Sequence, residues 1–148
     1  MTAAITLYDI VLWIHVLAAV VAFGSVFAYP VLLTTIGRSD ALGAFHAGQV
    51  VIWSRVVTPA MVVLFLAGIY LATDADVWSE PWVSATIVIL FALFGVVGAM
   101  TGVERRASEV AVGGGPGYDA VVGRLRRMDA AAIVLVVIAL FLMVVKPG

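Results

Sequence analysis

The chain consists of long apolar stretches separated by short segments that hold nearly all of its charges. A helix needs about 20 apolar residues to cross a bilayer. The apolar runs are continuous and do not alternate with polar residues, which argues against the strands of a membrane barrel. The pattern therefore predicts an all-α integral membrane four-helix bundle with spans over about 10–33, 56–73, 82–102 and 129–146.

The composition agrees with a single transmembrane domain covering residues 1–148. Hydrophobic residues make up 64% of the chain and charged residues 11%, against roughly 25% charged residues in soluble domains. The net charge of −1 provides no basic field for nucleic acid. Cysteine is missing, which excludes disulfides, thiolate metal sites and a cysteine nucleophile. The first apolar run is longer than the core of a signal peptide, so we expect it to be retained.

The basic residues predict the orientation of the four spans. Seven of the eight Lys and Arg residues lie between the first and second spans or between the third and fourth. Basic loops stay in the cytoplasm, so both termini are expected outside the cell membrane. Tryptophan favours membrane interfaces, which would place Trp78 and Trp82 at the outer interface and Trp53 near the inner one.

Two segments between the spans differ in character. Residues 39–55 are predicted to form a helix that extends the second span on the cytoplasmic side, with a bend at Pro59, because proline lacks an N–H group. Whether residues 39–55 lie in the cytoplasm or fold back into the membrane stays open. Residues 104–128 contain the sequence GGGPG at 113–117 and are predicted to form a flexible cytoplasmic loop.

Small residues at helical spacing suggest how the helices pack. His15, Ala18, Ala22, Ser25 and Tyr29 follow one another in steps of three and four, which places them on one face of the first span. We expect this face to point into the bundle. Gly98 and Gly102 form a G-x-x-x-G pair in the third span. Such pairs allow close helix contact, either inside the bundle or in a homo-oligomer.

His15 is the most informative residue, because it lies roughly 9 Å inside the outer end of a charge-free span. Ionisable groups at this depth are rare and often functional. The imidazole is a candidate ligand for haem iron or another metal. The alternative is a structural hydrogen bond to a neighbouring helix. His46, on the cytoplasmic side, is expected to be a solvated surface residue.

Three other charged residues have candidate roles near span ends. Arg55 suits contact with lipid phosphates or a carboxylate such as a haem propionate. Lys146 suits the same carboxylate contact from the outer side, or snorkels towards the headgroups. Asp129 is expected at the N-terminus of the fourth span, beside Arg126 and Arg127.

Enzyme signatures such as G-x-S-x-G, H-E-x-x-H and a phosphate-binding glycine loop do not occur in the sequence. The sequence therefore gives no support to a hydrolase or an ATPase and favours a protein that is not an enzyme. If the protein is an enzyme, a haem-dependent membrane oxidoreductase is the expected class.

Three segments carry a resemblance to known proteins: LWIHVLAAVVAFGSVF, WSRVVTPAMVVLFLAGIYLA and LFLMVVKPG. Together they resemble a bacterial family of small integral membrane proteins of unknown function. More distantly, they resemble the HemJ-type protoporphyrinogen oxidases and the membrane domain of copper-resistance protein D. The resemblance to the HemJ-type enzymes implies haem b binding through His15. It also matches Arg55 and Pro59 to their R-x-x-x-P step, and Lys146 to the Lys-Pro ending. The chain departs from those enzymes in having no acidic residue beside Arg55.

Three functional hypotheses follow. The first is a membrane protein that binds haem b or a porphyrin through His15. The second is a non-enzymatic membrane subunit or scaffold, oligomeric through Gly98 and Gly102. The third is a small-solute or metal-ion transporter, for which the methionines Met61, Met100 and Met143 would be the available soft ligands.

Overall fold

In the computed structural model, nearly every described residue is helical. The structure describes residues 4–36, 41–113 and 117–147. The helices are α1 (Leu7–Thr35), α2 (Leu42–Ile52), the π-helix η1 (Trp53–Val57), α3 (Thr58–Asp74), α4 (Pro81–Gly113) and α5 (Gly117–Val145). No strand occurs in these described ranges, which confirms the all-α prediction.

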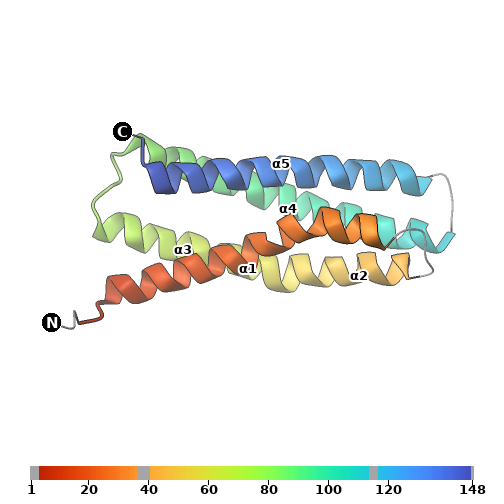
Figure 1. The fold of residues 1–148 in the computed structure, drawn as a ribbon, viewed down its shortest axis with the longest axis horizontal. Helices are drawn as coiled ribbons and strands as arrows, with labels where there is room; N and C mark the ends of the chain where they lie inside the picture. The colour runs from red at the N-terminus through yellow and green to blue at the C-terminus, as the bar shows by residue number, and fades with distance from the viewer. Residues whose placement is uncertain (1–3, 37–40, 114–116, 148) are drawn as a thin grey trace.

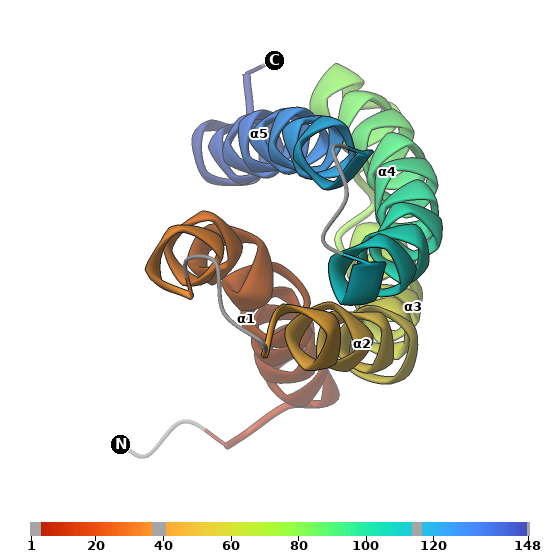
Figure 2. The same ribbon diagram turned by 90° about the vertical axis from the view of Figure 1, so that its right-hand side faces the viewer.

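Four long apolar helices result, because α2, η1 and α3 join into one continuous helix from Leu42 to Asp74, named here the α2–α3 helix. Figure 2 shows the four around a common axis in the order α1, α5, α4 and the α2–α3 helix. Both chain termini lie at one end, the terminal end, together with the turn between α3 and α4 (Figure 1). At the opposite end, the loop end, α1 and α4 finish and α2 and α5 begin. Each helix is long enough and apolar enough to cross a membrane.

The buried face of α1 is the one that the small-residue spacing predicts. Ala18, Ala22 and Tyr29 are buried, and His15 and Ser25 are half-buried on the same side. A capping box fixes the start of the helix: the Thr6 hydroxyl accepts the Asp9 N–H, and the Asp9 carboxylate accepts the Thr6 N–H. This box satisfies two of the backbone donors that every helix start leaves open.

The predicted extension of the second span is present as α2, and it meets α3 through the five-residue π-helix η1. Pro59 explains the irregular turn, since it has no N–H to donate to the preceding turn. The neighbouring Thr58 donates its N–H and its hydroxyl to the Trp53 carbonyl, the hydroxyl at 2.8 Å. The wider turn therefore ends directly before the proline.

The expected flexible loop over residues 104–128 is largely helical, so that prediction is wrong. Helix α4 continues to Gly113 and α5 begins at Gly117; residues 114–116 lie outside the described residues. No proline or glycine interrupts residues 103–112, and the apolar seam continues there with Val103 and Ala107 buried. Charged residues end an apolar window without ending a helix, because they are good helix formers.

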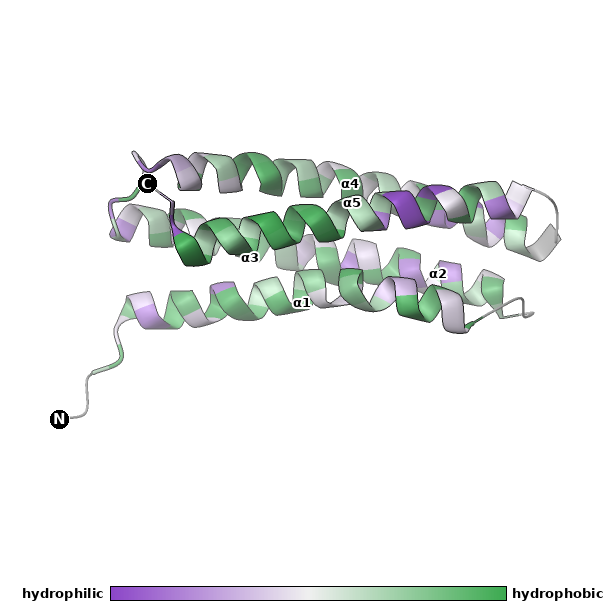
Figure 3. Cartoon of the chain, turned by 45° about the horizontal axis from the view of Figure 1, so that its top comes forward, coloured by the Kyte–Doolittle hydropathy of each residue, from purple (hydrophilic) through white to green (hydrophobic). Residues whose placement is uncertain are grey.

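The outer surface of the bundle is mainly apolar. Side chains such as Val20, Val88 and Val134 are more than half exposed. Hydrophilic residues gather towards the loop end on α4 and α5, whereas the half of α5 nearer the terminal end is strongly hydrophobic (Figure 3). An exposed apolar surface of this extent is typical of contact with lipid.

Gly98 and Gly102 face outward from α4. A Cβ added at either glycine would meet nothing within 4 Å. The G-x-x-x-G pair therefore plays no part in packing within this bundle.

Candidate functional site

A half-enclosed cavity of about 240 Å³, named here the outer cavity, lies at the terminal end between the four helices. It exists because α3 packs closely against α1 and makes much less contact with α4, so the two sides of the bundle separate there. Its walls are mainly apolar and aromatic and include Phe65, Trp78 and Trp82. Among them stand two nitrogen-bearing side chains, His15 of α1 and Lys146 at the end of α5.

His15 is held in one orientation by a backbone hydrogen bond. Its Nδ1 lies 3.0 Å from the Leu64 carbonyl oxygen of α3. A carbonyl oxygen only accepts, so Nδ1 carries the ring proton and donates it. Nε2 then keeps its lone pair, and it has no hydrogen bond to any described residue. Histidines that bind metals are typically oriented by this kind of bond from their second nitrogen.

Gly68 makes room for this imidazole. A Cβ at position 68 would lie 3.2 Å from His15 Cε1 and 3.6 Å from Nδ1. The first distance is shorter than ordinary van der Waals contact, so even an alanine would press on the ring. The α3 backbone thus supplies both the acceptor and the space for His15.

Lys146 places a cation at the same cavity. The residue follows the last turn of α5, where its N–H donates to the Leu142 carbonyl at 2.9 Å. Its φ of 48° ends the helix, and its Nζ lies 5.7 Å from the centre of the Trp82 ring. The outer cavity therefore combines an imidazole with a free nitrogen, a cation and an apolar lining.

Arg55, the third predicted site residue, lies elsewhere. It is exposed on η1 and does not line the outer cavity. The structure brings His15 and Lys146 together and leaves Arg55 apart from both. Lipid-phosphate contact is the role for Arg55 that this exposed position allows.

No protein-family model, curated protein or solved structure matches this chain.

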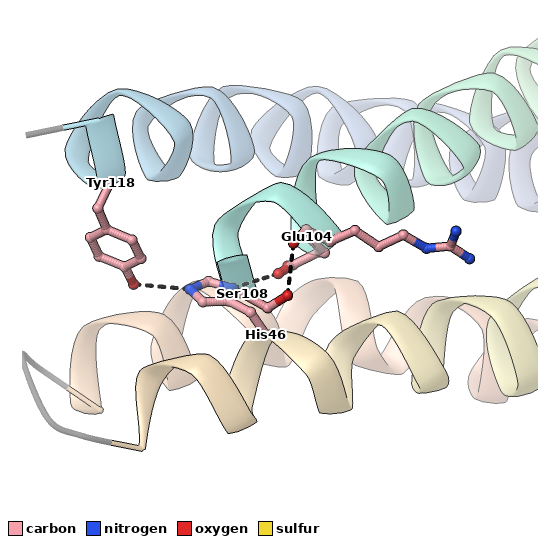
Figure 4. Close-up of polar contacts among 5 residues, drawn as sticks. His46, Glu104, Ser108 and Tyr118 are labelled. Atoms are coloured by element: carbon pink, nitrogen blue, oxygen red, sulfur yellow. Dashed lines mark hydrogen bonds and ion pairs between the residues drawn. The ribbon is translucent and has the colours of Figure 1, made fainter. Parts of the chain in front are cut away.

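A second polar site, named here the inner polar cluster, lies in the loop-end half of the bundle. It consists of buried or half-buried side chains from all four helices: Tyr29, His46, Trp53, Glu104, Tyr118 and Asp129. His46 stands at its centre (Figure 4). Its Nδ1 lies 2.5 Å from Glu104 Oε2, and its Nε2 lies 2.9 Å from the Tyr118 hydroxyl. Both His46 and Glu104 are fully buried.

Several polar atoms of this cluster have no hydrogen-bond partner among the described residues. They are the Tyr29 hydroxyl, Trp53 Nε1, Glu104 Oε1 and Asp129 Oδ1. The Tyr29 hydroxyl lies within electrostatic reach of both Glu104 and Asp129. Buried polar groups are nearly always satisfied in native proteins, so this concentration of open donors and acceptors marks a site.

Three predictions made from the sequence are wrong in this region. His46 is buried and paired instead of solvated, and Trp53 is buried in the bundle instead of lying at an interface. Asp129 lies in the middle of α5, not at a helix N-terminus. The errors at His46 and Asp129 share one cause: α4 and α5 extend further towards the loop end than the charge-free windows indicate, and α4 packs against α2 there.

The spacing of the buried residues would have revealed the cluster. The buried positions of α5 are Val122, Leu125, Asp129, Ala132, Val136 and Ala139, in alternating steps of three and four. Asp129 occupies a regular place in this seam, and Glu104 does so between Met100 and Ala107 of α4. A seam of this spacing points into a helix bundle whatever residue occupies it.

Metal coordination by several protein ligands finds no basis in these sites. Within the described ranges, no group of three or more His, Cys, Asp or Glu residues could hold a metal ion. His15 lies at the outer cavity and His46 in the inner polar cluster, so the two imidazoles do not share a site.

Proposed function

We propose that this protein is a multi-pass membrane protein that binds haem b or a related iron porphyrin in the outer cavity. His15 would be the axial ligand of the iron, and Lys146 would pair with a propionate. The observation that carries the proposal is the anchoring of His15 Nδ1 by the Leu64 carbonyl, which leaves Nε2 free beside a cavity that also contains Lys146. The resemblance of the first and last spans to HemJ-type enzymes agrees with the same two residues.

The donor set fits an iron porphyrin. Neutral imidazole is a common axial ligand of haem iron, and an ammonium group pairs well with a carboxylate. The volume of about 240 Å³ falls just below the roughly 300–1,000 Å³ of typical ligand sites. A ligand as large as a porphyrin would therefore be only partly enclosed, with its remainder at the open side of the cavity.

Each residue of the site has a defined task in this proposal. His15 binds and orients the ligand, Gly68 leaves space for the imidazole, and Lys146 offsets the charge of the ligand's carboxylate. The apolar walls exclude water from the bound face. A bound haem would supply one-electron redox chemistry, which the chain's own side chains do not provide.

An absorption titration tests the proposal. The protein is purified in detergent and titrated with haemin, and the Soret band is recorded for the wild type and for His15→Ala. We expect saturable binding with a histidine-ligated spectrum that is lost in His15→Ala. His46→Ala is unsuitable as a control because it disturbs a buried pair. Tyr70→Phe serves instead: it removes a hydroxyl from the half of α3 that lines the outer cavity. Equal spectra for the wild type and His15→Ala would refute the proposal.

We further propose that both termini face the outside of the cell membrane and that the α2–α3 helix extends on the cytoplasmic side, with a bend at Pro59. The asymmetry of the basic residues supports this orientation. Because the chain has no cysteine, single cysteines can report it. In intact cells, an impermeant maleimide should label Asp76→Cys, in the turn after α3, and should not label Glu109→Cys on α4. The reverse labelling pattern would overturn the orientation.

A second candidate function, self-association as a membrane scaffold, is favoured by the outward-facing glycines of α4. Gly98 and Gly102 leave open space at the surface of an apolar helix, which permits close approach of a second copy. Gly98→Leu should then abolish crosslinked dimers, whereas Gly24→Leu, an equally open glycine on α1, should leave them intact. A monomer under all crosslinking conditions would rule this candidate out.

A further inference from the structure

The inner polar cluster has no role in ligand binding at the outer cavity, and its composition is unusual for the interior of a membrane bundle. It contains two carboxyl groups, Glu104 and Asp129, but only one basic group, His46. The arginines of the neighbouring turns, Arg105 of α4 and Arg126 of α5, are exposed, and within the described residues the only salt-bridge partner of either carboxyl group is His46, at Glu104. No cation within the described residues therefore balances the second carboxyl group.

Charge balance fixes how many protons the cluster holds. Two ionised carboxylates and a neutral imidazole carry a charge of −2, so two added protons make the cluster neutral. Three titratable groups are available for these two protons. An unpaired buried charge is strongly unfavourable, so burial favours the neutral state of the cluster.

A hydrogen-bonded chain connects the buried groups with the loop end. Tyr118, at the start of α5, is half-buried, and its hydroxyl contacts His46 Nε2. His46 Nδ1 contacts the fully buried Glu104. Asp119 and Arg126 are the charged groups that act on Tyr118 at this edge. The chain thus begins at the half-buried Tyr118 side chain and ends at the fully buried Glu104 carboxyl group.

We propose that the inner polar cluster is a proton-binding site that exchanges protons with the aqueous phase at the loop end through Tyr118 and His46. A proton from water joins the Tyr118 oxygen as the hydroxyl proton moves to His46 Nε2. The Nδ1 proton then moves to Glu104 Oε2. One proton enters, no electron moves, and Glu104 changes from carboxylate to carboxylic acid while the imidazole returns to its neutral form.

The site opens to one side only. Between the inner polar cluster and the outer cavity, most buried side chains of the four helices are apolar, as at Ala22, Met61, Leu93 and Val136. The buried Ser25 hydroxyl lies on the same face of α1 but has no hydrogen-bond partner among the described residues, so it does not extend the chain. Apolar side chains cannot pass a proton onward. The cluster therefore responds to the proton concentration at the loop end and does not conduct protons across the bundle.

Infrared spectroscopy of the purified protein in lipid tests this proposal without any added ligand. A protonated carboxyl group gives a C=O stretching band that a carboxylate lacks. We expect such a band at neutral pH in the wild type. It should be lost or reduced in Asp129→Asn or Glu104→Gln and unchanged in Glu109→Gln, which removes an exposed acid of α4.

Exchange into heavy water tests the route. Tyr118→Phe should keep the C=O band and slow its exchange shift, whereas Tyr70→Phe, in the outer half, should not slow it. The absence of a protonated carboxyl band at neutral pH would overturn the site, and unchanged exchange in Tyr118→Phe would overturn the route. If Glu104→Gln fails to fold, Asp129→Asn and Tyr118→Phe still decide the matter. His15→Ala should leave every one of these signals unchanged, which keeps the result separate from haem binding.

Discussion

Replacing His46 should destabilise the protein more than replacing Glu104, and replacing both together should cost little. His46→Leu removes the partner of Glu104 Oε2 and leaves the carboxylate fully buried without a basic group beside it. Breaking a buried ion pair by removing one partner costs about 3–5 kcal/mol. Glu104→Met leaves a neutral imidazole that keeps its bond to Tyr118 and loses only the acceptor for Nδ1, at about 1–3 kcal/mol.

The double variant His46→Leu/Glu104→Met removes both polar groups and keeps similar volumes. Replacing a buried ion pair with apolar side chains is often neutral or stabilising, so we expect it to lie within about 1 kcal/mol of the wild type. The two single costs sum to about 4–8 kcal/mol. The coupling energy is therefore at least about 3 kcal/mol, more than a hundredfold in the unfolding equilibrium.

Reversible unfolding in mixed micelles, followed by circular dichroism, measures these free energies of unfolding. Glu109→Met, an exposed substitution on α4, is the matched control and should change the stability by no more than about 0.5 kcal/mol. Single effects that simply add, within about 0.5 kcal/mol, would show that His46 and Glu104 do not form a buried pair and would refute this reasoning.

Three further predictions concern single substitutions. Gly68→Ala should weaken haemin binding, because the new Cβ would lie 3.2 Å from His15 Cε1, whereas Gly24→Ala, with open space around it, should not. Equal affinities of Gly68→Ala and the wild type in a Soret titration would show that the new Cβ does not displace the imidazole. Lys146→Met should lower the affinity for haemin, and Lys146→Arg should largely preserve it. Wild-type affinity in both variants would refute a pairing of Lys146 with a propionate. Asp129→Leu should raise the free energy of unfolding by about 1 kcal/mol or more, since it removes a buried carboxyl oxygen that has no hydrogen-bond partner within the described residues. A clear loss of stability would mean that the Asp129 carboxyl group is hydrogen-bonded in the folded protein.

The sequence was sufficient to predict the four apolar helices and the inward face of α1. Both follow from local pattern: continuous apolar runs of spanning length, and small residues spaced for one helix face. The presence of His15 beside an apolar space could also be anticipated. Its neighbours could not, because the Leu64 carbonyl and Gly68 are placed by the packing of α3 on α1.

The inner polar cluster does not follow from the charge pattern, because charged residues normally indicate the aqueous phase and these are buried. The sequence pattern puts Glu104 in a cytoplasmic loop and Asp129 at the start of the fourth span, yet each occupies a regular position in the buried seam of its helix. His46 was placed at the surface for the same reason. The pairing of His46 with Glu104 joins residues 58 positions apart, and only the packing of α2 against α4 creates it.

Chemical rescue of the His15 position is the most direct test of iron binding by this histidine. In His15→Gly, the space of the imidazole is emptied, and free imidazole added to the haemin-loaded variant can take its place. We predict that the variant alone lacks the histidine-ligated Soret spectrum and that imidazole restores it in a saturable way, whereas Gly24→Ala needs no rescue. A wild-type spectrum in His15→Gly without imidazole would show that His15 does not bind the iron and would contradict the proposed function.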